Sequence, residues 1–260
     1  MSLEGIRVAN ENTALVITID RAERRNALSM ATMDSIRSVV SEAGDDGDVR
    51  TIIITGGPTF FSAGADLNEA LEVKSATDGF AFFGCFHRLA ETIERSGKPV
   101  IAAIEGFCMT GGCELAMACD LRVGARESSY AITSSRIGTV AGFGGTQRLP
   151  RLVGPANAME ILFSAEPITA EHAYRIGLIN RLTDKGQAMT EALQMADTFA
   201  KRAPLGLAFA KRAVHQGMQM DLASAIEMET FMATTIYGTE DKQEGVAAFL
   251  EKRKPEFKGR

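Results

Sequence analysis

Short apolar runs alternate with longer amphipathic segments along the first two thirds of the chain. Three of these runs are rich in β-branched residues: Ala14–Ile19, Thr51–Thr55 and Val100–Ile104. Such runs favour strands, and their nearly continuous apolar character predicts coverage on both faces, as in parallel sheets. The segments between them predict helices, one over residues 29–42 with Ser29 as its capping residue and one over residues 79–96.

After about Gly154 the pattern becomes largely helical. Predicted helices cover residues 155–163, 169–176, 186–202, 205–216 and 221–252, with one short strand near residues 178–182. The dipeptide Ala203-Pro204 separates the last two helices from the rest. We therefore predict an α/β core over residues 1–200 that carries the functional site, followed by a helical region over residues 201–260.

Composition and charge narrow the class of protein. The chain has 260 residues, of which 45% are hydrophobic and 23% charged, so it can bury a substantial core. Its net charge of −5 argues against a nucleic-acid-binding protein, which normally carries a basic face. The first ten residues, MSLEGIRVAN, lack the apolar region of a signal peptide, and no run approaches the roughly 18 apolar residues of a membrane span. We expect a cytoplasmic protein that does not enter membranes.

The four cysteines lie in apolar surroundings without CxxC spacing. This pattern is typical of reduced core thiols rather than of a disulfide framework or a metal site.

The segment GFCMTGGCELAMACD, residues 106–120, is the most informative for chemistry. It places Glu114 just after the pair Gly111 and Gly112, with only Cys113 between, where an apolar strand turns into a helix, and apolar residues follow Glu114 at once. A buried carboxylate can act as a base, and the free N–H groups of a new helix can stabilise a developing anion. Burial should raise the pKa of Glu114 and the helix start should lower it, and the sequence leaves both effects open. The pairing indicates enolate chemistry.

A second segment, FSAGADL over residues 61–67, combines small residues that let the backbone approach a ligand closely. Like the first segment, it lies in the stretch that follows a buried strand. The two together predict a joint ligand site.

Several segments together resemble one family: AGAD, KPVIAAIEGF, GGCELAMACD, GGTQRLPRLVG, ITAEHAYRIGLINRL and FLEKRKPEFKGR. They occur over essentially the whole chain and in the order found in the crotonase family, the enoyl-CoA hydratase/isomerase superfamily. This resemblance implies a spiral of ββα turns and a helical C-terminal region, residues 201–260, used for trimerisation. It also implies a homotrimer or dimer of trimers, an acyl-CoA thioester substrate, and no metal or redox cofactor.

The resemblance also implies roles for particular residues. The oxyanion hole falls on the backbone N–H groups of Ala65 and Gly111, and Glu114 becomes the general base. The acyl pocket falls on residues 71–86 and 140–143. The positions implied to bind coenzyme A are Arg25, Ala27, Ala63, Ala65, Asp66, Leu67, Phe249 and Lys252, the last two contributed by the C-terminal helix of the same or a neighbouring subunit.

Two positions depart from the family pattern. Ser134 stands where hydratases of this family carry a second glutamate, and Ala141 replaces a proline. A serine hydroxyl has a pKa far above seven, so it cannot replace a carboxylic acid as a proton donor. Three hypotheses remain: a one-base hydratase whose water is held by Ser134 or Tyr130, another enolate-type reaction (isomerisation, decarboxylation, dehydration or thioester hydrolysis), and a non-catalytic acyl-CoA binder.

Overall fold

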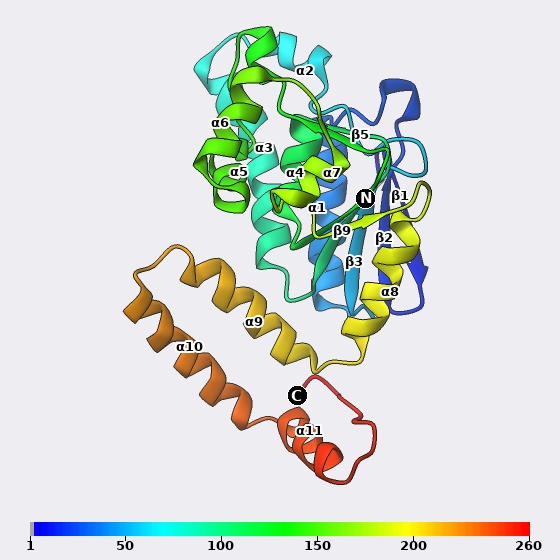
Figure 1. The fold of residues 1–260 in the computed structure, drawn as a ribbon, viewed down its shortest axis with the longest axis vertical. Coiled ribbons are helices and arrows are strands. Elements are labelled where there is room, and N and C mark those ends of the chain that lie inside the picture. The colour runs from blue at the N-terminus through cyan, green and yellow to red at the C-terminus, as the bar shows by residue number, and fades with distance from the viewer. Residues whose placement is uncertain (1–2) are drawn as a thin grey trace.

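The computed structural model describes residues 3–260, which form two sheets surrounded by helices (Figure 1). The larger sheet has six strands in the order β1-β2-β3-β4-β6-β9. Their bounds are Ile6–Glu11, Ala14–Ile19, Thr51–Thr55, Val100–Ile104, Leu121–Ala125 and Arg181–Thr183. All neighbours in this sheet pair in parallel except β1 and β2, which are antiparallel.

Both faces of this sheet are covered, which confirms the prediction made from its apolar runs. In β3, Ile52 and Ile54 belong to the main hydrophobic core, whereas Ile53 faces a second apolar cluster on the opposite side. The main core includes residues of α1 (Met30–Asp45) and α3 (Ala76–Arg95), and the second cluster is closed by α8 (Ala188–Ala200). The alternation of side chains along each strand therefore produces two apolar layers.

A smaller, three-stranded sheet carries the segments that follow the buried strands. It contains β5 (Phe107–Met109), β7 (Ser129–Ala131) and β8 (Ile168–Thr169), in that order. Because β5 follows β4 directly, the chain passes from the large sheet to the small one just before the Gly111-Gly112 helix start. The sequence prediction did not include this strand.

Most predicted helices are present, and capping residues define where several of them start. Ser29 caps α1 as predicted, its side chain accepting from Thr32 N. A capping box between Ser75 and Asp78 starts α3 before Gly79, and Asp66 caps a separate short helix, α2 (Leu67–Glu72). The remaining helices of the core are α4 (Gly111–Ala118), α5 (Gly145–Val153), α6 (Pro155–Ser164) and α7 (Ala170–Arg175).

Two further differences from the predicted secondary structure concern the C-terminal helices and strand β1. Residues 221–252 do not form one helix, because α10 (Leu222–Tyr237) ends at Gly238 and Thr239 caps a new helix, α11 (Glu240–Leu250). Strand β1 was missed because only Ile6 within it is buried, so its sequence lacks an apolar pattern. Both errors lie outside the candidate site.

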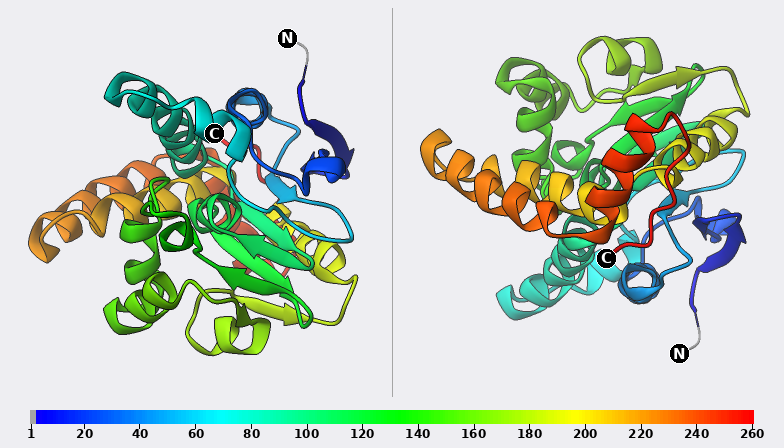
Figure 2. Two further views of the ribbon diagram at one scale, coloured as in Figure 1. Left: turned by 90° about the horizontal axis from the view of Figure 1, so that it is seen from above. Right: turned by 90° about the horizontal axis from the view of Figure 1, so that it is seen from below.

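The C-terminal helices extend away from the body of the molecule (Figures 1 and 2). α9 (Pro204–Gly217) packs along α10, and the segment after α11 folds back so that Asp241 accepts from Lys258 N and Gly259 N. α9 is fixed to the body through Lys211, whose Nζ lies 2.8 Å from Asp120 Oδ2. Many large apolar side chains of this region are exposed, among them Met218, Leu222, Phe231 and Phe249.

The four cysteines all lie within the described residues, and each is buried and free. Burial raises the pKa of the Cys119 thiol to about 12, as expected for a core residue. Among residues 3–260, no helix has the length and apolar content needed to cross a membrane.

Candidate active site

Two loop segments bring the backbone of Ala65 and Gly111 together. Residue 64 is a glycine with φ of +109°, and a Cβ there would lie 3.1 Å from Gly111 N, so no other residue fits without strain. A Cβ placed on Gly111 would in turn lie 3.0 Å from Ala65 N. The two residues predicted to form an oxyanion hole are therefore direct neighbours.

Both N–H groups are available to a ligand. Leu28 N donates to Gly64 O (2.7 Å), and Asp66 N donates to Leu28 O (3.0 Å). These two bonds lie on either side of Ala65 and do not use its N–H group. Gly111 begins α4, where the first N–H groups have no partner within the helix. Within the described part of the chain, neither N–H donates to a protein acceptor.

The residue before α4 fixes where this helix starts. Thr110 has φ of 41° and ψ of −110°, an unusual conformation for a residue with a side chain. Its N donates to Ala131 O (2.7 Å), and its Oγ1 lies 2.7 Å from Thr133 Oγ1. These bonds from β7 and the turn that follows it hold a strained backbone in place beside the N–H groups of Ala65 and Gly111.

Glu114 lies in the first turns of the same helix and is 1% exposed. Its Oε1 accepts two backbone hydrogen bonds, from Phe143 N (2.9 Å) and Gly145 N (2.8 Å). Its Oε2 accepts no hydrogen bond from the described residues. Because Oε2 is nevertheless not a fully buried polar atom without a partner, it keeps some surface that a small molecule can reach. One oxygen is thus anchored and the other is free to exchange a proton.

Burial raises the pKa of Glu114 from its usual 4.5 to about 7. The hydrogen bonds from Gly145 and Phe143 and the positive charge of Arg148 act in the opposite direction, and burial outweighs them. A carboxylate with this pKa can accept and release a proton near neutral pH, as a general base requires.

The sequence did not predict that the loop over residues 142–145 binds Glu114. Arg148 of α5 donates from Nη1 to Phe143 O (3.2 Å) and from Nε to Glu94 Oε1 (2.6 Å) on α3. His87 Nε2 donates to Gly142 O (2.8 Å), which ties the same loop to α3. The Gly144-Gly145 pair was the available signal, because a Cβ on Gly145 would lie 2.8 Å from Glu114 Oε1.

The structure places Ser134 and Tyr130 differently: Ser134 follows a residue that bonds to Thr110, whereas the Tyr130 hydroxyl is hydrogen-bonded within the core. Ser134 opens a short 3-10 helix, η2 (Ser134–Ile137), is buried, and directly follows Thr133, which contacts Thr110. The Tyr130 hydroxyl lies 2.9 Å from Ser128 Oγ and fills the space beside Gly124. Of the two residues considered as holders of a catalytic water, Ser134 is therefore the remaining candidate.

The predicted coenzyme A positions before residue 70 come together in one place. Ala63 N donates to Arg25 O (3.0 Å), and Ala27 O accepts a hydrogen bond from Arg21. Asp66 also pairs with Arg21, 3.0 Å away, and caps α2. Although burial raises the pKa of Asp66, its bonds with Arg21 and Asn68 lower it below the usual value overall. The side chains of Arg25 and Leu67, at the ends of these two hydrogen-bonded segments, are exposed.

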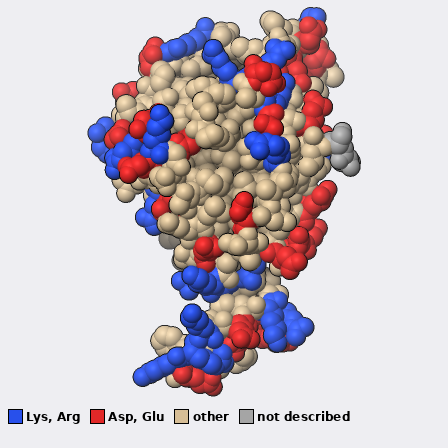
Figure 3. All heavy atoms as spheres, turned by 90° about the vertical axis from the view of Figure 1, so that its right-hand side faces the viewer, with Lys and Arg blue, Asp and Glu red and all other residues tan. Residues whose placement is uncertain are grey.

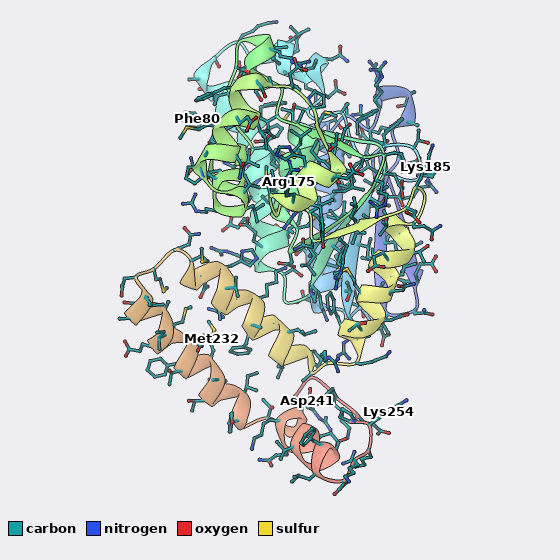
Figure 4. The ribbon with its side chains drawn as sticks, in the orientation of Figure 1. Phe80, Arg175, Lys185, Met232, Asp241 and Lys254 are labelled. Atoms are coloured by element: carbon teal, nitrogen blue, oxygen red, sulfur yellow. The ribbon has the colours of Figure 1, made fainter. Side chains whose placement is uncertain are left out.

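Phe249 and Lys252 are not brought to this place within one chain. Phe249 belongs to α11 and is 82% exposed, and Lys252 follows the end of that helix. α11 lies at the opposite end of the molecule from α2 (Figure 1), and the nearby Lys254 is correspondingly far from Phe80 (Figure 4). Within one chain these two residues therefore lie apart from the other predicted coenzyme A positions, and their assignment to that site stays a prediction.

Comparisons with known proteins agree with this geometry. The sequence model of the family described as "Enoyl-CoA hydratase/isomerase" matches residues 9–260. The chain is 38% identical over 258 residues to a crotonyl-CoA hydratase from Syntrophomonas wolfei, covering 99% of both chains. It is 37% identical to a short-chain-enoyl-CoA hydratase from Clostridium acetobutylicum, covering 100% of both.

Solved structures extend the likeness to the fold. A crystal structure of enoyl-CoA hydratase from Bacillus anthracis superposes with a TM-score of 0.94 at 32% identity, covering 99% of this chain and 100% of that one. The protein has the crotonase fold and is an enzyme with an enoyl-CoA hydratase-like function. It belongs to the enoyl-CoA hydratase/isomerase family.

Proposed function

We propose that this enzyme adds water to a short 2-enoyl-CoA, with Glu114 as its general base and the N–H groups of Ala65 and Gly111 as its oxyanion hole. The observation that carries this proposal is a single helix, α4, that presents a free N–H at its start and a buried carboxylate one turn later. That spacing lets one helix act on both the thioester oxygen and the double bond of a bound substrate.

In the proposed reaction, the thioester oxygen accepts from both N–H groups. Glu114 Oε2 takes a proton from a water molecule while the water oxygen bonds to the β-carbon, and the π electrons move to form an enolate at the thioester. The two N–H groups stabilise this charge more than the charge of the ground state, which lowers the barrier. The protonated Glu114 then returns its proton to the α-carbon, so the carboxylate is regenerated.

The absence of a second carboxylate shapes this mechanism. Ser134 Oγ can orient the attacking water by hydrogen bonding, but it is far too weak an acid to supply the α-carbon proton. Glu114 therefore handles both proton transfers in turn. Its pKa of about 7 suits this double role, because both protonation states are accessible near neutral pH.

The proposal extends to binding and assembly. Coenzyme A enters as part of the substrate along Arg25, Ala27, Ala63, Asp66 and Leu67, and no resident cofactor is assigned. Phe249 and Lys252 of a neighbouring subunit complete that site in a homotrimer or a dimer of trimers. The exposed apolar side chains of α9–α11 support such an assembly, because a contiguous apolar surface on a free subunit is usually an interface.

Location and partners follow from the same chemistry. The proposed location is the cytoplasm, where the four free cysteines stay reduced. We assign no nucleic-acid or membrane partner. On the face drawn in Figure 3, acidic and basic side chains are interspersed rather than gathered into a single basic surface, in keeping with the net charge of −5.

The test is turnover of crotonyl-CoA by the purified wild-type protein, followed as loss of the absorbance of the conjugated thioester. We expect measurable hydration, and a faster rate in Ser134→Glu, which adds the missing acid. The matched control is Ser135→Glu, because Ser135 is the exposed neighbour on η2. Tight binding of butyryl-CoA without any turnover of crotonyl-CoA would contradict hydration and favour another enolate reaction or a non-catalytic binder.

A further inference from the structure

The backbone conformation of Thr110 determines the direction of the Gly111 N–H group. The Thr110 carbonyl and the Gly111 N–H belong to one peptide group, and the carbonyl accepts from Glu114 N at 2.8 Å. In a planar trans peptide the N–H points opposite to the C=O, so this bond leaves the Gly111 N–H facing out of the start of α4. The direction of the donor therefore depends on the ψ angle of Thr110.

This conformation is strained for a threonine. With φ of 41° and ψ of −110°, Thr110 lies outside the left-handed region that Arg25 (φ 53°, ψ 38°) and Ala165 (φ 53°, ψ 19°) occupy. At such a φ, the well open to residues with a side chain has ψ of about +47°. Relaxation into that well would rotate the peptide by almost half a turn, so the Gly111 N–H would change direction and the bond to Glu114 N would break.

The stretch of residues 131–133 holds Thr110 against this relaxation. Thr110 N donates to Ala131 O at 2.7 Å, its Oγ1 accepts from Thr133 N at 3.1 Å, and the two threonine Oγ1 atoms lie 2.7 Å apart. Because both the backbone and the side chain of Thr110 bond to this stretch, the residue cannot rotate about its N–Cα bond without losing these bonds. A strained residue persists only where its surroundings restrain it in this way.

We propose that the hydroxyl pair of Thr110 and Thr133 positions one donor of the oxyanion hole. The pair keeps the peptide between Thr110 and Gly111 in the strained orientation in which its N–H faces the thioester oxygen. Both threonines act through Gly111 and are positioning residues. This inference rests on the proposed function, because it concerns how one proposed donor is kept in place.

The first test removes the hydroxyl of Thr110 and keeps the strain. Valine has nearly the shape of threonine but cannot bond to Thr133, so in Thr110→Val we expect kcat for crotonyl-CoA to fall by about tenfold or more. The Kd of butyryl-CoA, measured by calorimetry, should change by less than about twofold, because a ground-state thioester carries little charge on its oxygen. Thr110→Ser keeps the hydroxyl and should restore most of the wild-type kcat.

The second test removes the strain. Glycine adopts positive φ without steric cost, so Thr110→Gly does not need a hydroxyl to hold its backbone. We expect Thr133→Val to lower kcat by about threefold or more when residue 110 is threonine, and to have no effect in the Thr110→Gly background. A hydroxyl that only stabilises the fold would cause the same change of kcat in both backgrounds.

The third test measures the donors without turnover. Donors to the thioester oxygen draw electron density along a conjugated acyl group, which moves the absorption of bound cinnamoyl-CoA to longer wavelength. We expect this shift in the wild-type protein and a smaller shift in Thr110→Val. The control is Thr32→Val, which breaks a hydroxyl pair of the same kind at the start of α1, Ser29 Oγ with Thr32 Oγ1 at 2.9 Å, and should keep the wild-type shift.

An unchanged kcat and an unchanged spectral shift in a folded Thr110→Val variant would overturn the inference, as would equal effects of Thr133→Val in the two backgrounds. If Thr110→Val does not fold, Thr133→Val replaces it in the spectral test, because its backbone N can still donate to Thr110 Oγ1. A smaller shift in the variant of a protein that hydrates nothing would support the role of the hydroxyl pair and contradict the proposed hydration alone.

Discussion

At Glu114, two backbone N–H groups hold one carboxylate oxygen while the other reaches accessible space. This asymmetry explains how a carboxylate in a helix can be buried and still act as a base. The anchored oxygen fixes the direction of the side chain, and burial sets the pKa near 7. The hydrogen bonds to Oε1 therefore control where the Glu114 carboxylate lies, whereas burial controls its pKa.

Gly111 gives the first prediction at this scale. A Cβ there would lie 3.0 Å from Ala65 N and from the Phe143 ring, in the space that a thioester oxygen needs. We expect Gly111→Ala to lower kcat/KM for crotonyl-CoA by about 100-fold or more, comparable to the loss of one oxyanion donor. Steady-state kinetics would measure this loss.

The control for Gly111→Ala is Gly44→Ala. Gly44 lies in α1 and a Cβ there meets nothing within 4 Å, so this change should leave activity intact and stabilise the helix slightly. Equal activity of the Gly111→Ala variant and the wild-type protein would contradict the assignment of the oxyanion hole.

At the scale of elements, the site depends on how three helices are fixed to one another. α4 carries Gly111 and Glu114, α5 carries Arg148, and α3 carries Glu94 and His87. Arg148 joins α5 to α3 through Glu94, 2.6 Å away, and holds the loop whose N–H groups bind Glu114. Arg148 is thus a positioning residue that also acts on Glu114 through its charge.

Replacing Arg148 by Leu should shift the pH dependence of the reaction. The positive charge of Arg148 lowers the pKa of Glu114, so removing it should raise that pKa above about 7. Because a base works in its deprotonated form, the midpoint of kcat/KM against pH should move to higher pH. Measured pH profiles of the two proteins would show the shift.

Arg151→Leu is the matched control for this change. Arg151 lies on the same helix and is exposed, and among residues 3–260 its side chain bonds only to Gln147. Its midpoint should stay at the wild-type value. A decrease in rate for Arg148→Leu with no change of midpoint would indicate a purely structural role.

The same elements show what sequence could and could not predict. Strands β2, β3 and β4 were predicted because nearly every side chain in them is apolar. Glu114 and Gly111 were predicted as site residues because a glycine pair precedes a charged residue inside an apolar helix. The partners of Glu114 could not be predicted, because they are backbone N–H groups of Phe143 and Gly145, which any residue possesses. The fold determines which backbone N–H groups face Glu114, and the residue types at those positions do not reveal it.

At the scale of the whole molecule, one chain does not bring all the proposed site residues together. The body contains Glu114 and the proposed oxyanion hole, whereas α11 with Phe249 lies at the far end of the C-terminal region (Figure 1). The helical character of that region was predictable from its sequence pattern. Its direction relative to the body was not, because that direction depends on long-range contacts such as Lys211 with Asp120.

Assembly can be tested on α10. Phe231 is 68% exposed on this helix, next to Met232, which lies far from the body in Figure 4. We expect the wild-type protein to have three or six times the mass of one chain by light scattering. Phe231→Glu should lower this mass towards that of a single chain, since a buried unpaired charge disfavours an apolar interface. The control is Thr234→Glu, a charge added on the same helix at an exposed polar position. A monomeric wild-type protein would contradict the proposed assembly.

The most direct test of the central claim is the pH dependence of crotonyl-CoA hydration in the wild-type protein and in Glu114→Gln. Gln keeps an oxygen that can accept from Phe143 N and Gly145 N, so it removes the base while preserving the loop. We predict that wild-type kcat/KM rises with pH through a midpoint of about 7, the pKa of Glu114, and that Glu114→Gln loses this dependence together with nearly all activity. Hydration by Glu114→Gln at the wild-type rate, or a wild-type midpoint near 4.5, the usual value for a glutamate, would contradict the assignment of Glu114 as the base.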